Sequence, residues 1–109
     1  MAVDAARSLG TPGTEGHALR VLGDISRQTG SLDALETEQS YRDGLAIAVE
    51  WGMRPLQARC HLGLGIMLRT LGRDEEAREE LTVAVEMLRS MGMTYWMPEA
   101  EAELAQATG

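Results

Sequence analysis

Apolar residues recur along the chain at the spacing of one helix face. One stripe after Gly72 advances in steps of 4, 3, 4 and 3 residues and comprises Ala77, Leu81, Ala84, Leu88 and Met91. A shorter stripe upstream comprises Tyr41, Leu45 and Ala48. Steps of three and four place side chains on one side of an α-helix, whereas a half-buried strand alternates at every second position. No stretch shows sustained alternation, so the pattern predicts an all-α fold.

Glycine and proline divide the chain into stretches of about 12–20 residues, the ordinary length of a globular helix. The breaks fall at residues 10–16, 29–31, 51–55, 71–73 and 91–93. Pro55 and Pro98 suit the first turn of a helix, where a missing N–H costs nothing. Gly92 suits the C-terminal cap of the helix before it. The acidic residues 74–76 suit the first turn of that helix, where the helix dipole favours negative charge.

The chain contains an internal repeat. Leu22-Gly23 precedes Gly30 by the same spacing as Leu64-Gly65 precedes Gly72, at an offset of 42 residues. Gly52-Met53 and Gly92-Met93 close the two units at an offset of 40, so the first unit carries two extra residues near 31–35. Each unit is predicted to be a helix, a short glycine turn and an antiparallel second helix. A self-similar helical hairpin at this period is typical of an α-solenoid.

The second unit resembles a tetratricopeptide repeat (TPR). The residues that match the contact positions between the two helices of that repeat are Leu64, Gly65, Gly72, Ala77, Leu81 and Ala84. The unit has His61 and Leu68 where aromatic residues are usual, and no closing proline. The first unit is more degenerate, since it keeps Tyr41 but has Ser26, Thr37 and Gly44 at other positions of the pattern. The resemblance implies stacked hairpins whose first helices line an inner, concave surface.

A closer resemblance is to the helical repeat regions at the C-terminal ends of large bacterial regulators. These are nucleotide cyclases with an ATPase module and LuxR-type transcription activators. The likeness rests on residues 45–56, 59–65, 91–97 and 99–104, and it covers roughly residues 15–105. None of the catalytic or nucleotide-binding portions of those regulators is present in this sequence. The resemblance therefore implies a sensory or assembly role in a bacterial regulatory protein.

The expected architecture is a TPR-like α-solenoid of two antiparallel helical hairpins. Residues 1–14 are expected to form a partial helix (about Val3–Leu9) and a Gly/Pro linker, 15–54 the first unit, 55–93 the second, and 94–109 a C-terminal capping helix (about Thr94–Ala107). Solenoids usually need about three units to bury a continuous core. With two and a half units, we expect either a piece of a longer protein or a homodimer. In one form of the homodimer, the two copies exchange their N-terminal helices across residues 10–16.

Composition narrows the function further. The net charge is −7, all ten basic residues are Arg, and there is no Lys. The missing Lys excludes a Walker-type phosphate loop and Schiff-base catalysis. The acidic balance argues against direct binding of nucleic acid or an anionic membrane. A single Cys and the absence of a signal peptide or membrane-spanning segment predict a cytoplasmic protein.

Residues that could carry catalysis or bind a metal have plainer interpretations. Cys60 and His61 are adjacent, so on a helix their side chains diverge, and we expect a buried structural Cys and a packing His. One Cys and two His without ligand spacing indicate no metal site, and no motif calls for a cofactor. The acidic cluster at residues 75–80 is expected to be a solvated helix face. We therefore expect a protein that is not an enzyme.

One set of charged and apolar residues, spaced along two predicted helices, suggests a binding groove. It comprises Arg20, Asp24 and Arg27 on the first helix of unit one, and Arg59, Leu62, Ile66 and Arg69 on the first helix of unit two. The resemblance directs both sets to the inner surface. Four Arg there would make a locally basic groove suited to the carboxylates of a protein or peptide partner. The alternative is that Asp24 simply pairs with Arg20 and Arg27.

Two further features concern packing. Gly63 and Gly65 inside a helix cost about 1 kcal/mol each relative to Ala, which predicts close approach of a neighbouring helix. The Met-rich C-terminal part holds Met87, Met91, Met93, Trp96 and Met97. These side chains are expected to lie in the core, with a contact surface as the alternative; Met93, Trp96 and Met97 are the candidates for self-association. A non-catalytic protein–protein interaction or scaffold module is thus the leading function, and a self-associating oligomerisation domain is the alternative.

Overall fold

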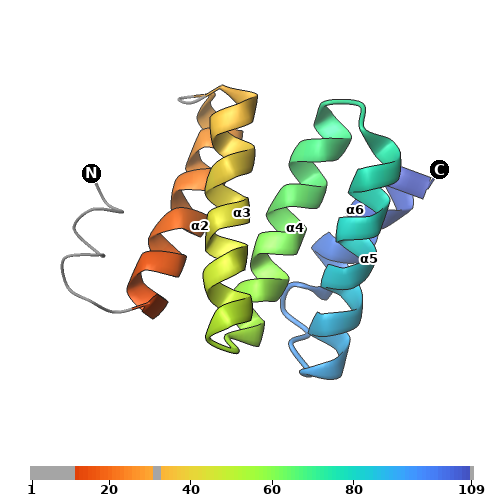
Figure 1. Cartoon of the computed structure of the whole chain (residues 1–109). Helices are drawn as coiled ribbons and strands as arrows, with labels where there is room; N and C mark the ends of the chain where they lie inside the picture. Colours follow the sequence, from red (N-terminus) through yellow and green to blue (C-terminus); the bar gives the residue numbers. More distant parts are fainter. Residues whose placement is uncertain (1–11, 31–32, 109) are drawn as a thin grey trace.

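The computed structural model describes residues 12–30 and 33–108, and within them five helices and no strand form the secondary structure. The helices are α2 (Pro12–Thr29), α3 (Ala34–Glu50), α4 (Arg54–Thr70), α5 (Asp74–Ser90) and α6 (Met97–Thr108). Helices α2 to α5 stand side by side, and α6 lies behind α4 and α5 (Figure 1). Each helix packs on the next one along the chain, and α4 also contacts α2 and α6. The predicted all-α arrangement of antiparallel hairpins is confirmed.

Three of the connections share one cap. Helices α3, α4 and α5 are followed by glycines with positive φ, Gly52 at 65°, Gly72 at 80° and Gly92 at 68°. In each case the N–H after the glycine binds the carbonyl five residues back, as Met93 N binds Leu88 O at 2.9 Å. This is the Schellman pattern, which needs the left-handed conformation that glycine adopts without strain. The cap at Gly92 is therefore as predicted.

The turn inside the first hairpin is longer than its counterpart in the second. Gly30 has a φ of 72°, like Gly72, yet α3 begins four residues after Gly30 whereas α5 begins two residues after Gly72. The two extra residues are those expected near 31–35. Asp33 caps α3 by accepting a hydrogen bond from Glu36 N at 2.8 Å. Such a cap satisfies an N–H that the first helical turn leaves without a partner.

Two boundaries differ from the expectation. The break expected over 10–16 is shorter, because α2 already begins at Pro12 and Gly16 is helical. A Cβ added at Gly16 would lie 2.6 Å from Leu56 Cδ2, so close packing on α4 offsets the poor helix propensity of glycine here. The last helix begins at Met97 rather than near Thr94, after a turn in which Met97 N binds Thr94 O at 3.3 Å. The expected helix at about 3–9 lies outside the described residues.

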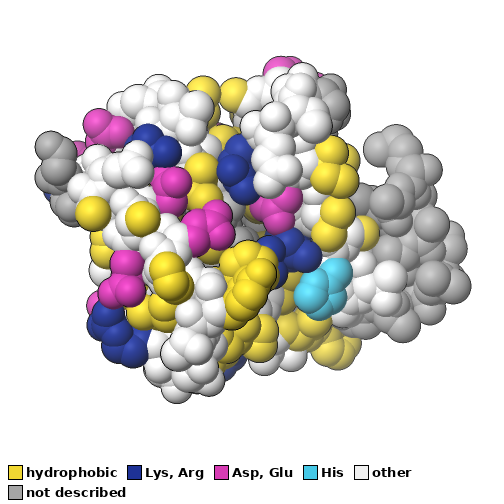
Figure 2. Space-filling view, turned by 180° about the vertical axis from the view of Figure 1, so that it is seen from behind, with side chains coloured by type: hydrophobic (Ala, Val, Ile, Leu, Met, Phe, Trp, Pro, Cys, Tyr) yellow, Lys and Arg dark blue, Asp and Glu magenta, His cyan; other side chains and the backbone are white. Residues whose placement is uncertain are grey.

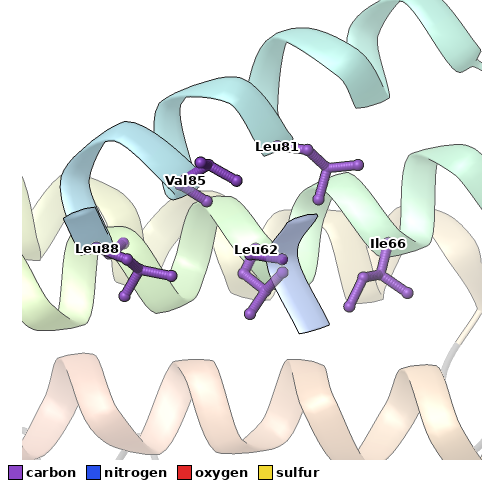
Figure 3. Close-up of a cluster of buried hydrophobic side chains, with 8 residues drawn as sticks. Leu62, Ile66, Leu81, Val85 and Leu88 are labelled. Carbon is purple, nitrogen blue, oxygen red and sulfur yellow. The ribbon is translucent and has the colours of Figure 1, made fainter. Parts of the chain in front are cut away.

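The core lies mainly between α4 and α5. Eight buried residues form its largest cluster: Ala58, Leu62, Ile66, Leu81, Ala84, Val85, Leu88 and Ala100. Figure 3 shows Leu62 and Ile66 on α4 facing Leu81, Val85 and Leu88 on α5. Four of the five residues in the predicted stripe of α5 are fully buried, while Met91 is partly buried. The helical spacing thus identified the buried face of α5 correctly.

Glycines in α2 and α4 let large side chains approach the helix backbone. A Cβ added at Gly65 would lie 2.4 Å from Leu81 Cγ, and one at Gly63 would lie 2.3 Å from the Tyr41 ring. A Cβ at Gly23 would lie 2.9 Å from the same ring, so Tyr41 fits between α2 and α4. The predicted close approach at Gly63 and Gly65 is confirmed. Tyr41 and Leu81 are equivalent in the repeat, and each packs on the glycine of its own hairpin.

Candidate partner-binding site

Asp24 is the centre of a charged cluster on α2. Steps of four and three residues place Arg20, Asp24 and Arg27 on one face of the helix. Arg20 Nη1 donates to Asp24 Oδ2 at 2.6 Å, and Arg27 Nη2 lies 3.7 Å from Asp24 Oδ1. Arg59 of α4 adds a third guanidinium, with Nη2 at 3.9 Å from Asp24 Oδ2. The pairing of Asp24 with Arg20 and Arg27 is therefore present, and it extends to the second hairpin.

Tyr41 joins α3 to this cluster. Its hydroxyl donates to Asp24 Oδ1 and accepts from Arg27 Nε at 3.1 Å. The ring reaches Asp24 because Gly23 and Gly63 leave room on both sides of it. Burial and the hydrogen bond to Asp24 raise the pKa of Tyr41, so the phenol stays protonated. The apolar stripe and the TPR pattern both assigned Tyr41 a packing position, and this polar role was not predicted.

The four candidate residues on α4 have different environments. Leu62 and Ile66 are only 4% and 7% exposed, because they belong to the cluster that α5 and α6 cover. Arg59 lies over the Trp96 ring, with 3.7 Å between the guanidinium carbon and the ring centroid. Arg69 Nε donates to Glu103 of α6 at 2.8 Å. Arg69 is thus paired within the molecule, while Arg59 is stacked against an aromatic face.

A pocket of about 200 Å³ lies where α2, α4 and the start of α6 meet. Five of the seven predicted groove residues line it: Asp24, Arg27, Arg59, Leu62 and Ile66. Trp96 and Glu99 complete one wall, and Gln28 and Gly63 complete the lining. Arg20 and Arg69 do not line the pocket. The structure thus brings most of the predicted set together, with apolar side chains beside two guanidiniums.

The charges around the pocket are close to balanced. Burial would lower the pKa of Arg27, but the hydrogen bond to the Tyr41 hydroxyl and the charge of Asp24 outweigh it and raise that pKa. Burial and the neighbouring charge of Arg20 lower the pKa of Arg59. Seen from the side of α6, basic and acidic side chains lie close together among apolar ones (Figure 2). The predicted Arg surface is therefore interspersed with carboxylates.

Two donors beside the pocket are near Asp24 without being hydrogen-bonded to it. The distances of 3.7 Å for Arg27 Nη2 and 3.9 Å for Arg59 Nη2 exceed the ordinary range for an N–H···O bond. A carboxylate entering the pocket would meet these two donors beside the carboxylates of Asp24 and Glu99, which line the same pocket. Planar guanidiniums bind carboxylates at two points, which gives direction as well as attraction.

Cys60 and His61, the two residues considered for catalysis, are both buried within the fold. Cys60 is fully buried, and burial raises the pKa of its thiol to about 12. A thiol of such a pKa is almost entirely protonated near neutral pH, which makes it a poor nucleophile. His61 is buried on α4, with Nδ1 at 3.3 Å from Glu80 Oε1. The predicted burial of Cys60 is confirmed, and His61 lies between α4 and α5 as a packing residue.

The residues that the structure describes contain no group of three or more His, Cys, Asp or Glu side chains arranged to hold a metal ion. Within the same part of the chain, no helix has the length and apolar character needed to cross a bilayer.

The Met-rich C-terminal residues lie against the core and remain partly exposed. Met87, Met91, Met93, Trp96 and Met97 all pack against the cluster between α4 and α5 while being only partly buried. Tyr95 is 81% exposed and stacks edge-on against Trp96, with ring centroids 4.7 Å apart. The prediction that these side chains lie in the core is therefore confirmed in part. Tyr95 and part of Trp96 remain exposed to solvent.

Trp96 and Glu99, which line the pocket, and Glu103, which binds Arg69, were not predicted at this site. Their positions depend on the turn at 94–96, which directs α6 across α4. No local pattern encodes that crossing. Comparisons of the chain with protein-family models, with curated proteins and with solved structures find no match.

Proposed function

We propose that this domain is a non-catalytic interaction module whose pocket accepts a side chain of an acidic protein or peptide. The guanidiniums of Arg27 and Arg59 beside the buried Leu62 and Ile66 at one pocket carry the proposal. The resemblance to TPR-like regions of bacterial regulators supports a sensory or assembly role in such a cytoplasmic regulatory protein. The overall acidity of the chain supports a protein partner over nucleic acid.

The size of the pocket favours a protein side chain over a small-molecule substrate. Ligand sites for small molecules usually enclose roughly 300–1,000 Å³. The pocket here has about 200 Å³ and is open on one side. Arg27 and Arg59 would bind a carboxylate of the partner, while Leu62 and Ile66 would contact an adjoining apolar group. Affinity would then come from a few anchors in a larger contact, as in other protein interfaces.

An array of synthetic hexapeptides tests the proposal. The peptides vary in Asp and Glu content beside one large apolar residue, and each has a partner in which Asn or Gln replaces the acid. We expect the domain to retain the acidic peptides at least tenfold more strongly than their amide partners. Arg27→Ala with Arg59→Ala abolishes that preference, whereas Arg78→Ala on the exposed face of α5 retains it. Equal retention of acidic and amide peptides would overturn the proposal.

Self-association is the alternative function. Tyr95 is exposed, and Met93, Trp96 and Met97 are only partly buried, so a second copy could cover the aromatic and Met side chains at 93–97. A homodimer through this surface predicts a molar mass by light scattering that rises towards two chains with concentration. Tyr95→Ser should weaken the dimer and leave the melting temperature of the monomer unchanged. A clean monomer at every concentration would exclude this alternative.

A further inference from the structure

The outer face of α2 is apolar and partly open. The α2 apolar face comprises Thr14, Ala18, Val21, Leu22 and Ile25, with His17 at its edge, and it lines a hollow of about 380 Å³. Val21 and Ile25 are 41% and 49% exposed. Among the described helices, α2 packs only on α3 and α4. An apolar stripe at helical spacing is typical of a surface that another segment covers.

The repeat shows what covers the same positions on α4. At the offset of 42 residues, the α2 apolar face corresponds to Leu56, Cys60, Gly63, Leu64 and Met67, all of which are buried. Helix α3 covers them: Ala48 packs with Leu56 and Cys60. The segment that covers α4 therefore precedes it directly and is joined to it by the short turn at 51–53. The expected occupant of the α2 apolar face is an equivalent segment just before α2.

The residues before α2 have the sequence of such a segment. Residues 2–10 read Ala-Val-Asp-Ala-Ala-Arg-Ser-Leu-Gly, and residues 84–92 at the end of α5 read Ala-Val-Glu-Met-Leu-Arg-Ser-Met-Gly. Five of the nine positions are identical, and the third position is acidic in both. In α5, Ala84, Val85 and Leu88 are buried, whereas the polar positions 86, 89 and 90 are exposed. The same division assigns residues 2, 3 and 6 to an inward-facing side.

We propose that residues 2–9 dock on the α2 apolar face of their own chain. In the register of the repeat, Ala6 corresponds to Ala48 and lies over Thr14 and Ala18, which correspond to Leu56 and Cys60. Gly10 corresponds to Gly52 and turns the chain back along α2. A connection as short as that at 51–53 brings the segment onto its own helix rather than onto a second copy. The segment then covers the half of the face at the start of α2.

Disulfide trapping tests both the register and the occupant. The variant carries Ala6→Cys and Ala18→Cys in a Cys60→Ser background and is oxidised with diamide. The matched control carries Ala6→Cys with Gln28→Cys, an exposed position more than two helical turns further along α2. We expect the first pair to close at least tenfold faster than the control and to migrate as a monomer on a non-reducing gel.

Each outcome decides the proposal. Equal rates for the two pairs would overturn the register. A disulfide-linked dimer would overturn docking within one chain and favour exchange of the segment between two copies. A second measurement uses Ala6→Asp and Ser8→Asp, which place the same charge on the inward and outward sides. Only Ala6→Asp should lower the melting temperature, and equal melting of the two variants would contradict the proposal.

Discussion

Equivalent positions carry charged side chains in the first hairpin and buried apolar side chains in the second. Arg20 and Asp24 of α2 correspond in the repeat to Leu62 and Ile66 of α4. The first pair belongs to an ion-pair cluster beside the pocket, whereas the second pair is buried in the main core. On the second helices, the Tyr41 hydroxyl reaches into the ion-pair cluster, while its counterpart Leu81 is fully apolar and fully buried.

The difference follows from what lies over each hairpin. The turn at 94–96 and α6 cover the inner face of the second hairpin, so apolar side chains there are removed from water. The inner face of the first hairpin borders the pocket, where Asp24 remains 22% exposed. Burying apolar surface contributes roughly 25 cal/mol per Å², whereas partly exposed ion pairs contribute little. We therefore expect the second hairpin to contribute most of the stability and the first to contribute the binding chemistry.

The largest expected effect concerns the closest helix contact of the second hairpin. Gly65→Leu forces a side chain into Leu81, whose backbone N would also lie 3.3 Å from the new Cβ. We expect a loss of more than about 3 kcal/mol in the free energy of unfolding, measured by urea titration. Gly13→Ala is the control, because its Cβ would meet only the flexible end of Met53. A Gly65→Leu variant that melts like the wild type would contradict the packing of this hairpin.

Removing the side chain that packs on Gly65 tests the same core from the other side. Leu81 is fully buried, so Leu81→Ala should cost about 3 kcal/mol through lost burial and the cavity left behind. Leu35→Ala removes the same atoms from a position that is 74% exposed and should change stability by less than about 0.5 kcal/mol. Similar losses in the two variants would show that the core is not where the structure places it.

The polar counterpart in the first hairpin should matter less for stability. Tyr41→Phe keeps the ring between Gly23 and Gly63 but removes the hydroxyl that bonds Asp24 and Arg27. We expect a loss of about 1.5 kcal/mol, because hydrogen bonds to charged groups contribute that much. Tyr95→Phe, at a residue 81% exposed, is the control and should be neutral. A loss equal to that of Leu81→Ala would remove the contrast between the hairpins.

Local features of the fold could be predicted from the sequence, and contacts across the fold could not. The stripe in α5, the glycine caps and the approach at Gly65 depend on neighbours in sequence or on one hairpin, which the spacing encodes. Arg59 over Trp96 and Arg69 with Glu103 depend on the direction that α6 takes. Likewise, the reach of Tyr41 to Asp24 depends on two glycines in different helices. These contacts depend on how the helices pack together, which the spacing of apolar residues along the sequence does not encode.

The smallest expected effect concerns an ion pair that links the two hairpins. Glu38 of α3 accepts from Arg42 at 2.9 Å and from Arg73, just before α5, at 3.0 Å. Burial would raise the pKa of Glu38, but these two hydrogen bonds hold it below its ordinary value of 4.5. A lowered pKa in the folded state means that the stabilisation is complete above about pH 4.5 and is lost as the pH falls through the lowered pKa.

Glu38→Gln should therefore lower stability at pH 7 by less than about 1 kcal/mol and have a smaller effect near pH 3, because the stabilisation from the ionised carboxylate declines as the pH falls below about 4.5. Thermal melts at both pH values, with the exposed Glu79→Gln as the control, measure this difference. Because the pair joins α3 to the start of α5, its loss should destabilise both hairpins together. A loss at pH 3 as large as at pH 7 would show that the ionised carboxylate does not link them.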